Sequence, residues 1–166
     1  IKIMARVVIK KVTKTKAGFS LETEANGAIT GSHLLVAAGR IANVEGMNLE
    51  AAGVAYTKRG ITVDASLRSS RRHIYAIGDV AGGLQFTHVA GYQAGLVIRN
   101  ALFRLPVKNR TDIIPWVTYT DPELAHVGLT EAAAKKEFGG TVKVLRWPFH
   151  DNDRAQAEGK TAGLIK

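Results

Sequence analysis

A short apolar segment that ends in glycine and aspartate constrains the fold of this chain more than any other feature. Residues 74–77 are apolar or aromatic without alternation, which predicts a strand covered on both faces, and Gly78 and Asp79 close it abruptly. After a glycine-rich turn, Thr87 is the predicted N-cap of a helix from about residue 88 to residue 103. A buried strand, a turn and a helix in this order indicate an α/β fold.

Other apolar patterns predict further strands on the N-terminal side. Residues 34–38 form a continuous apolar run that indicates a second buried strand. Residues 1–9 and 19–23 alternate in polarity, and the Asn26-Gly27 pair favours a tight hairpin, because both central positions of such a turn need a positive φ. We therefore expect an antiparallel β-meander ahead of the buried strands.

The C-terminal third predicts a small antiparallel layer with one helix. Asp121 and Pro122 favour a turn between two strands, Thr130 is a predicted helix N-cap, and Gly139 ends that helix. The expected elements are strands at residues 115–120 and 124–127, a helix after Thr130, a strand at 141–145 and another from residue 164.

Composition excludes several classes of function. The 166 residues suit one domain or parts of two. The absence of cysteine excludes a disulfide scaffold, a thiolate metal site and a cysteine nucleophile on this chain. None of the five histidines pairs with another at i, i+4, so we expect no metal site. No apolar run approaches the ~20 residues that span a bilayer, so we expect no membrane contact and a cytoplasmic location.

The chain is basic, with 23 Lys+Arg against 14 Asp+Glu and a formal net charge of +9. The basic residues fall in separate clusters, at residues 10–16, 68–72 and 135–136, and not on one face with aromatics between them. We therefore expect a solvated surface without a nucleic-acid partner, or a field that steers an anionic dinucleotide.

The candidate ligand-binding groups are Asp79 and the helix that follows it. A carboxylate at the end of a central strand accepts hydrogen bonds from a hydroxyl-rich ligand. Eight residues later, the helix that begins at Thr87 offers free backbone N–H groups and the positive end of its dipole. A polyol held by Asp79 and a ring carbonyl at Thr87 are what a flavin requires; the alternative is an aspartate that only closes a turn.

Several ordered motifs resemble those of the pyridine nucleotide–disulfide oxidoreductases, a family that includes dihydrolipoamide dehydrogenase and mercuric reductase. The second flavin motif of the family is resembled by residues 62–64, 74–80 and 87–90. Residues 35–40 resemble the segment that returns from the nicotinamide domain to the flavin domain, with Ala38 where threonine is commoner. The start of the dimerisation domain is resembled by residues 119–123, 127–131 and 152–155.

The resemblance implies the domain organisation. It implies part of a doubly wound FAD/NAD(P)-binding domain (β-meander plus sheet), followed by part of an α+β dimerisation domain. Residues 1–33 would be the tail of the NAD(P)-binding domain, 34–110 the C-terminal part of the FAD-binding domain, and 111–166 the first part of the dimerisation domain. The chain opens without an initiator methionine inside an alternating pattern, so we expect an internal piece of a longer protein.

The resemblance also implies roles for individual residues. Asp79 would bind the ribityl chain of FAD with Gly78 allowing close approach, and the Thr87 N–H would face the flavin pyrimidine carbonyl. Gln85 would lie beside the contact between flavin and nicotinamide, and Arg40 near the dinucleotide part of FAD. The complete predicted cofactor-binding set is Gly39, Arg40, Gly78, Asp79, Gln85, Phe86, Thr87, His88 and Ala90.

The implied function is a segment of an FAD-dependent NAD(P)H oxidoreductase. Such an enzyme passes a hydride from nicotinamide to flavin, and electrons on to a disulfide, a metal ion or a similar small acceptor, as a homodimer. Gln85-Phe86 favours the mercuric reductase-like branch. The family's cysteine pair would lie upstream and its His–Glu pair downstream, so no catalytic residue is predicted on this chain, which alone should be inactive. The alternative is a non-catalytic flavin-fold binding or dimerisation module.

Overall fold

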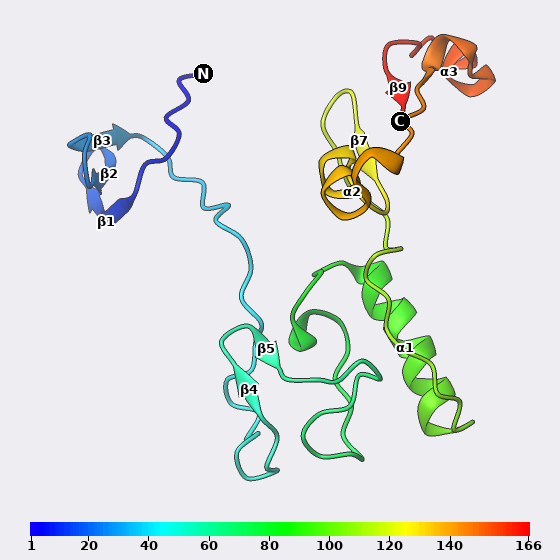
Figure 1. Ribbon diagram of the computed structural model, residues 1–166. Helices are drawn as coiled ribbons and strands as arrows, with labels where there is room; N and C mark the ends of the chain where they lie inside the picture. The colour runs from blue at the N-terminus through cyan, green and yellow to red at the C-terminus, as the bar shows by residue number, and fades with distance from the viewer. The chain divides into compact units, whose positions relative to one another are not determined.

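The computed structural model describes residues 1–166, which form two compact units, Ile1–Arg40 and Ile41–Lys166 (Figure 1). Helices and strands both occur, which agrees with the predicted mixed α/β class. The longest helix has 15 residues, and no helix has the length and apolar character needed to cross a membrane.

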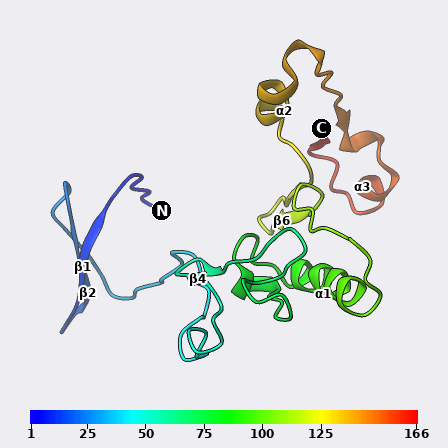
Figure 2. The same ribbon diagram turned by 60° about the horizontal axis from the view of Figure 1, so that its bottom comes forward.

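The first unit is an antiparallel meander of three strands, as predicted: β1 (Ile9–Thr15), β2 (Gly18–Thr23) and β3 (Ala28–Gly31) (Figure 1). Figure 2 shows β1 and β2 side by side. The turn after β2 is longer than the predicted two-residue turn. Thr23 Oγ1 closes it by accepting from the Asn26 N–H at 3.0 Å and donating to the Gly27 carbonyl at 2.7 Å.

Two predicted strands in this unit are wrong. The first strand begins only at Ile9, because Arg6 has a φ of 58° and interrupts the extended backbone ahead of it. Residues 34–38 form no strand, and Leu35 and Val36 are 90% and 75% exposed. A buried strand needs neighbouring backbones for its N–H and C=O groups, and no strand of this chain pairs with that segment.

The second unit begins with a hairpin of β4 (Tyr56–Thr57) and β5 (Gly60–Ile61) over a hydrophobic core. Residues 74–77 lie on this core as an extended segment with one isolated bridge, from Tyr75 to Arg68. The expected strand inside a wide sheet is therefore wrong in form, because the segment has a single backbone neighbour in the chain. The core residues are Ala42, Val44, Leu49, Val54, Ile61 and Ala76.

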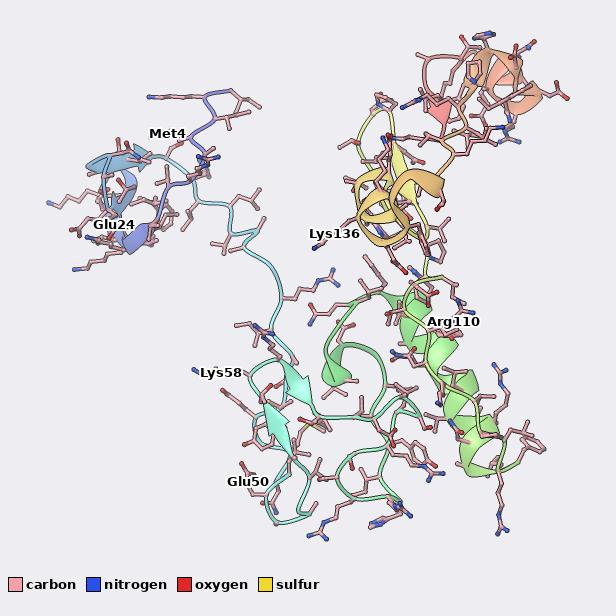
Figure 3. All side chains as sticks on the ribbon, viewed as in Figure 1. Met4, Glu24, Glu50, Lys58, Arg110 and Lys136 are labelled. Atoms are coloured by element: carbon pink, nitrogen blue, oxygen red, sulfur yellow. The ribbon has the colours of Figure 1, made fainter.

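A 3-10 helix, η1 (Gly78–Ala81), follows this segment, and the longest helix, α1 (Thr87–Ala101), comes next. α1 buries one face, formed by Val89, Gln93, Leu96 and Asn100. The chain then returns along α1, and Arg110 lies on this returning segment (Figure 3). The Arg110 N–H donates to the Tyr92 hydroxyl at 3.2 Å.

The remaining elements are short. The predicted turn at Asp121-Pro122 joins two paired strands, and Thr130 caps α2 by accepting from the Ala133 N–H at 3.2 Å, as predicted. The strand expected at residues 141–145 is absent, because the last strand pairs with residues 147–148 instead. The elements are β6 (Trp116–Thr118), β7 (Leu124–His126), α2 (Glu131–Phe138), η2 (Gly139–Thr141), β8 (Trp147–Pro148), η3 (Phe149–Asp151), α3 (Asp153–Ala157) and β9 (Leu164–Ile165).

Candidate functional site

The turn at Gly78 and Asp79 reverses the chain at the end of the extended segment. Ile77 is still extended, with φ −136° and ψ 160°, whereas Gly78 has a φ of +65°, which L side chains rarely adopt. The Gly82 N–H donates to the Asp79 carbonyl at 3.1 Å and closes the turn. The next two residues, Val80 and Ala81, pack on the hydrophobic core and anchor η1 there.

α1 holds the turn from one side. A Cβ on Gly78 would lie 2.9 Å from the Cβ of Ala90, which is closer than carbon atoms normally approach. The buried Gly78 N–H donates to Oε1 of Gln93, one helical turn further along α1, at 2.6 Å. The glycine is thus required both by its backbone conformation and by its proximity to α1.

The hairpin of β4 and β5 holds the turn from another side. A Cβ on Gly60 would lie 2.5 Å from the Val80 carbonyl oxygen, so the backbones of β5 and η1 are in direct contact. Core packing, the contact with the Ala90 side chain and the backbone contact with β5 therefore fix the position of η1.

The Asp79 side chain is exposed, and its carboxylate makes no hydrogen bond or ion pair within the chain. The turn is closed by backbone groups, so the alternative of an aspartate that only closes a turn finds no hydrogen bond to support it. An unpartnered carboxylate on a rigid turn can accept hydrogen bonds from the hydroxyl groups of a ligand.

The N-terminus of α1 lies eight residues beyond Asp79 in the sequence. Thr87 was predicted as the N-cap, but it is the first helical residue, because Phe86 is the last extended one and its carbonyl accepts from the Val89 and Ala90 N–H groups. No side chain caps the helix and its first turn carries no acidic residue. The first N–H groups of α1 therefore have no intrahelical acceptor and can bind an electron-rich oxygen.

An aromatic pair stiffens this helix start. The rings of Phe86 and His88 stack with centroids 5.3 Å apart and an interplanar angle of 12°. His88 Nε2 donates to the carbonyl of Pro115 at 2.8 Å, which fixes a proton on that nitrogen. His88 thereby joins the start of α1 to the residue that precedes β6.

The predicted cofactor-binding residues fall into two groups. Those from Gly78 to Ala90 lie on η1, on the first turn of α1 or in the loop between them, where Gln85 is half-buried, and η1 contacts α1 directly. Gly39 and Arg40 are exposed at the end of the first unit, and both lie outside the unit that contains Asp79.

Two contributors to the site, Gln93 and the Pro115 carbonyl, were not predicted from the sequence. Gln93 is 4% exposed. The sequence pattern that could have identified it is a polar residue on the apolar face of α1, between Val89 and Leu96. A backbone carbonyl such as that of Pro115 has no signature in the sequence.

Glu131 forms the main cluster of charges, in the C-terminal region at the first turn of α2. Its carboxylate contacts Lys135, Lys166 at 2.7 Å and Arg146 at 3.5 Å. Hydrogen bonds from Lys135 and Lys166 lower the pKa of Glu131 from 4.5 to about 2. This cluster ties α2 to residues far along the chain.

The polar groups at η1 and at the start of α1 fit the FAD that is expected from the sequence. Asp79 supplies an acceptor for the hydroxyl groups of a ribityl chain, and the start of α1 supplies N–H donors for a ring carbonyl. Contacts with α1 and with the hydrophobic core hold the turn that carries Asp79, and an electrostatic binding site requires groups that are held in place.

Comparison with known proteins identifies two matching family models. The model described as pyridine nucleotide-disulphide oxidoreductase matches residues 1–94, and the model of the dimerisation domain of the same group matches residues 114–166. These matches agree with the predicted fold class: part of a dinucleotide-binding domain followed by part of a dimerisation domain.

The relatives and solved structures cover almost the whole chain. A mercuric reductase of Staphylococcus aureus is 39% identical over 99% of the chain and 30% of its own length, and a dihydrolipoyl dehydrogenase of Bacillus subtilis is 35% identical over 98% and 35%. LpdA from Mycobacterium tuberculosis matches 95% of the chain and 34% of its own with a TM-score of 0.82 and 28% identity. The HOCl-induced flavoprotein disulfide reductase RclA from Escherichia coli matches 95% and 36%, with a TM-score of 0.74 and 28% identity. The chain thus spans about a third of the length of each of these proteins.

Proposed function

The chain belongs to the pyridine nucleotide-disulphide oxidoreductase family, and from this premise we propose that it forms part of a longer FAD-dependent NAD(P)H oxidoreductase. FAD and NAD(P)H are the cofactors of this family. When bound, FAD supplies a two-electron carrier between NAD(P)H and an acceptor. The names of the relatives, which are reductases and dehydrogenases, support an enzyme over a non-catalytic binding or dimerisation module.

In this proposal the chain contributes the flavin-binding turn and part of the dimer interface. Residues 1–33 end the NAD(P)-binding domain, 34–110 complete the FAD-binding domain and 111–166 begin the dimerisation domain. The acceptor is a disulfide, a metal ion or a similar small molecule, and the protein acts as a homodimer in the cytoplasm, where reduced nicotinamide is available. The chain has no cysteine, so we expect it to be inactive on its own.

In this proposal some of the residues bind FAD, and others stabilise charge on its ring. Asp79 would accept hydrogen bonds from the ribityl hydroxyls of FAD, while Gly78 keeps the turn close to α1. The backbone N–H groups at Thr87 and His88 would bind a ring carbonyl of FAD and would stabilise negative charge there. Gln85 would lie beside the contact between flavin and nicotinamide, and Phe86 and Ala90 belong to the same cofactor-binding set. Gly39 and Arg40 would lie near the dinucleotide part of FAD.

The observation that carries the proposal is the free Asp79 carboxylate on a turn clamped against α1, within the residues that match the family model. In the full-length protein, Asp79→Ala should raise the Kd for FAD roughly 10- to 100-fold, as expected for the loss of hydrogen bonds to a charged group. The measurement is a titration of the apoprotein with FAD, in which flavin fluorescence monitors binding.

Asp112→Ala is the matched control, because Asp112 is an exposed aspartate whose carboxylate pairs with Arg110 at 2.6 Å. It should leave FAD binding unchanged. An Asp79→Ala protein that binds FAD as tightly as wild type would refute the role of Asp79.

A further inference from the structure

Gln93 is a buried amide on an otherwise apolar stretch of α1. It is 4% exposed and lies between Val89 and Leu96, which are buried on the same helix face. Burying an amide is unfavourable unless it forms hydrogen bonds, so a leucine or methionine at this position would serve packing better. The presence of glutamine therefore calls for a polar partner.

That partner is the turn which carries Asp79. The Gln93 Oε1 accepts from the Gly78 N–H at 2.6 Å, and Gly78 is buried. As the first residue of η1, Gly78 has no acceptor for its N–H within that helix, and an unpaired N–H is costly when buried. Gln93 supplies the acceptor that the local backbone lacks.

Ala90 and Gln93 both contact Gly78 from one face of α1. They are three residues apart, so their side chains lie on neighbouring positions of the helix surface. Ala90 sets how closely the turn approaches α1. The hydrogen bond that the Gly78 N–H donates to Gln93 sets the orientation of the backbone just before Asp79.

We propose that Gln93 is a positioning residue for FAD. It fixes the Gly78-Asp79 turn against α1, so that the Asp79 carboxylate and the N–H groups at the start of α1 bind two parts of one flavin at the same time. This inference rests on the proposed function, because it assumes that Asp79 binds FAD.

The variants separate the hydrogen bond from packing. Gln93→Met has a similar length but no strong acceptor, whereas Gln93→Glu keeps an acceptor at the same reach. In the full-length protein we expect Gln93→Met to raise the Kd for FAD roughly 10-fold, and Gln93→Glu to remain within about 3-fold of wild type. Should the Met protein fail to fold, Gln93→Asn, which is one methylene too short, should weaken FAD binding in its place.

Asn100→Leu is the matched structural control. Asn100 is 5% exposed on the same helix face, and its Nδ2 donates to the Val107 carbonyl at 3.0 Å, away from η1. It should lower the unfolding temperature as Gln93→Met does, yet leave the FAD Kd within about 3-fold of wild type. Equal loss of FAD affinity in both variants would mean general destabilisation and would overturn the inference.

A double-mutant cycle gives the sharpest readout. If Gln93 acts through Asp79, Gln93→Met should cost little further FAD affinity once Asp79 is alanine. Additive losses, or unchanged FAD affinity in Gln93→Met and Gln93→Asn, would overturn the positioning role. Failure of the proposed function is distinct, because Asp79→Ala alone would then bind FAD normally.

Discussion

Substituting Gly78 by alanine tests the packing of the turn on α1 directly. The added Cβ would lie 2.9 Å from the Ala90 Cβ, and the backbone would keep a φ of +65°. The left-handed backbone costs about 1 kcal/mol for an alanine, and overpacking of this kind adds about 1–3 kcal/mol. We therefore expect Gly78→Ala to lower the free energy of unfolding by about 2–4 kcal/mol.

Gly83→Ala isolates the backbone contribution. Gly83 has a similar φ of +75°, but an added Cβ would meet no atom within 4 Å. Its substitution should cost only about 1 kcal/mol. The difference between the two variants measures the contact between Gly78 and Ala90.

The assay is urea unfolding of the full-length apoprotein, so that FAD binding does not add to the measured stability. Ala90→Gly should cost about 1 kcal/mol alone, because glycine is a poor helix former. Combined with Gly78→Ala, it should recover the steric part, a coupling energy of about 1–3 kcal/mol. Equal effects of Gly78→Ala and Gly83→Ala, or no coupling to Ala90, would refute the close approach of η1 to α1.

Two further predictions concern the C-terminal region. The pKa of Glu131 is lowered to about 2, so its ion pairs stabilise the fold fully above pH 4.5 and are lost as the pH falls from 4.5 toward 2. Over this pH range the unfolding temperature of the wild type should fall, and that of Glu131→Gln should fall less. Parallel curves of unfolding temperature against pH for the two proteins would contradict the assignment. Thr130→Ala removes the acceptor for the Ala133 N–H and should cost about 1 kcal/mol of stability, whereas Thr130→Ser should be nearly neutral. An alanine variant as stable as wild type would show that this cap contributes nothing.

Local patterns predicted the elements whose partners lie nearby in the sequence. The alternation at residues 19–23 gave β2, the turn at Asp121-Pro122 gave the pairing of β6 and β7, and Thr130 gave the start of α2. In each case the hydrogen-bond partners lie in one hairpin or in one helical turn, so a continuous stretch of sequence contains both partners.

The strands expected from continuous apolar runs did not form. Residues 34–38 and 74–77 have the composition of central strands, but a central strand needs a backbone neighbour on each side. An apolar composition indicates that a segment favours burial, but it does not indicate whether a neighbouring strand is present to cover the segment. Leu35 and Val36 are accordingly exposed in this chain.

The candidate site was predictable in part. Gly78, Asp79 and Thr87 carry a local signature of glycine, carboxylate and helix start. The contacts that hold them do not, since Gln93 reaches Gly78 across 15 positions and His88 reaches the Pro115 carbonyl across 27. Such contacts depend on how α1 lies against its neighbours, which residue spacing alone does not give.

Cofactor binding and reduction of the full-length protein test the central claim most directly. The protein should be purified, supplied with FAD and titrated anaerobically with NADH and NADPH while the flavin absorbance is recorded. A stoichiometric FAD complex whose oxidised-flavin absorbance disappears on adding one of the two nucleotides is the result that this account predicts. A protein that binds no FAD, or whose bound flavin neither nucleotide reduces, would contradict it.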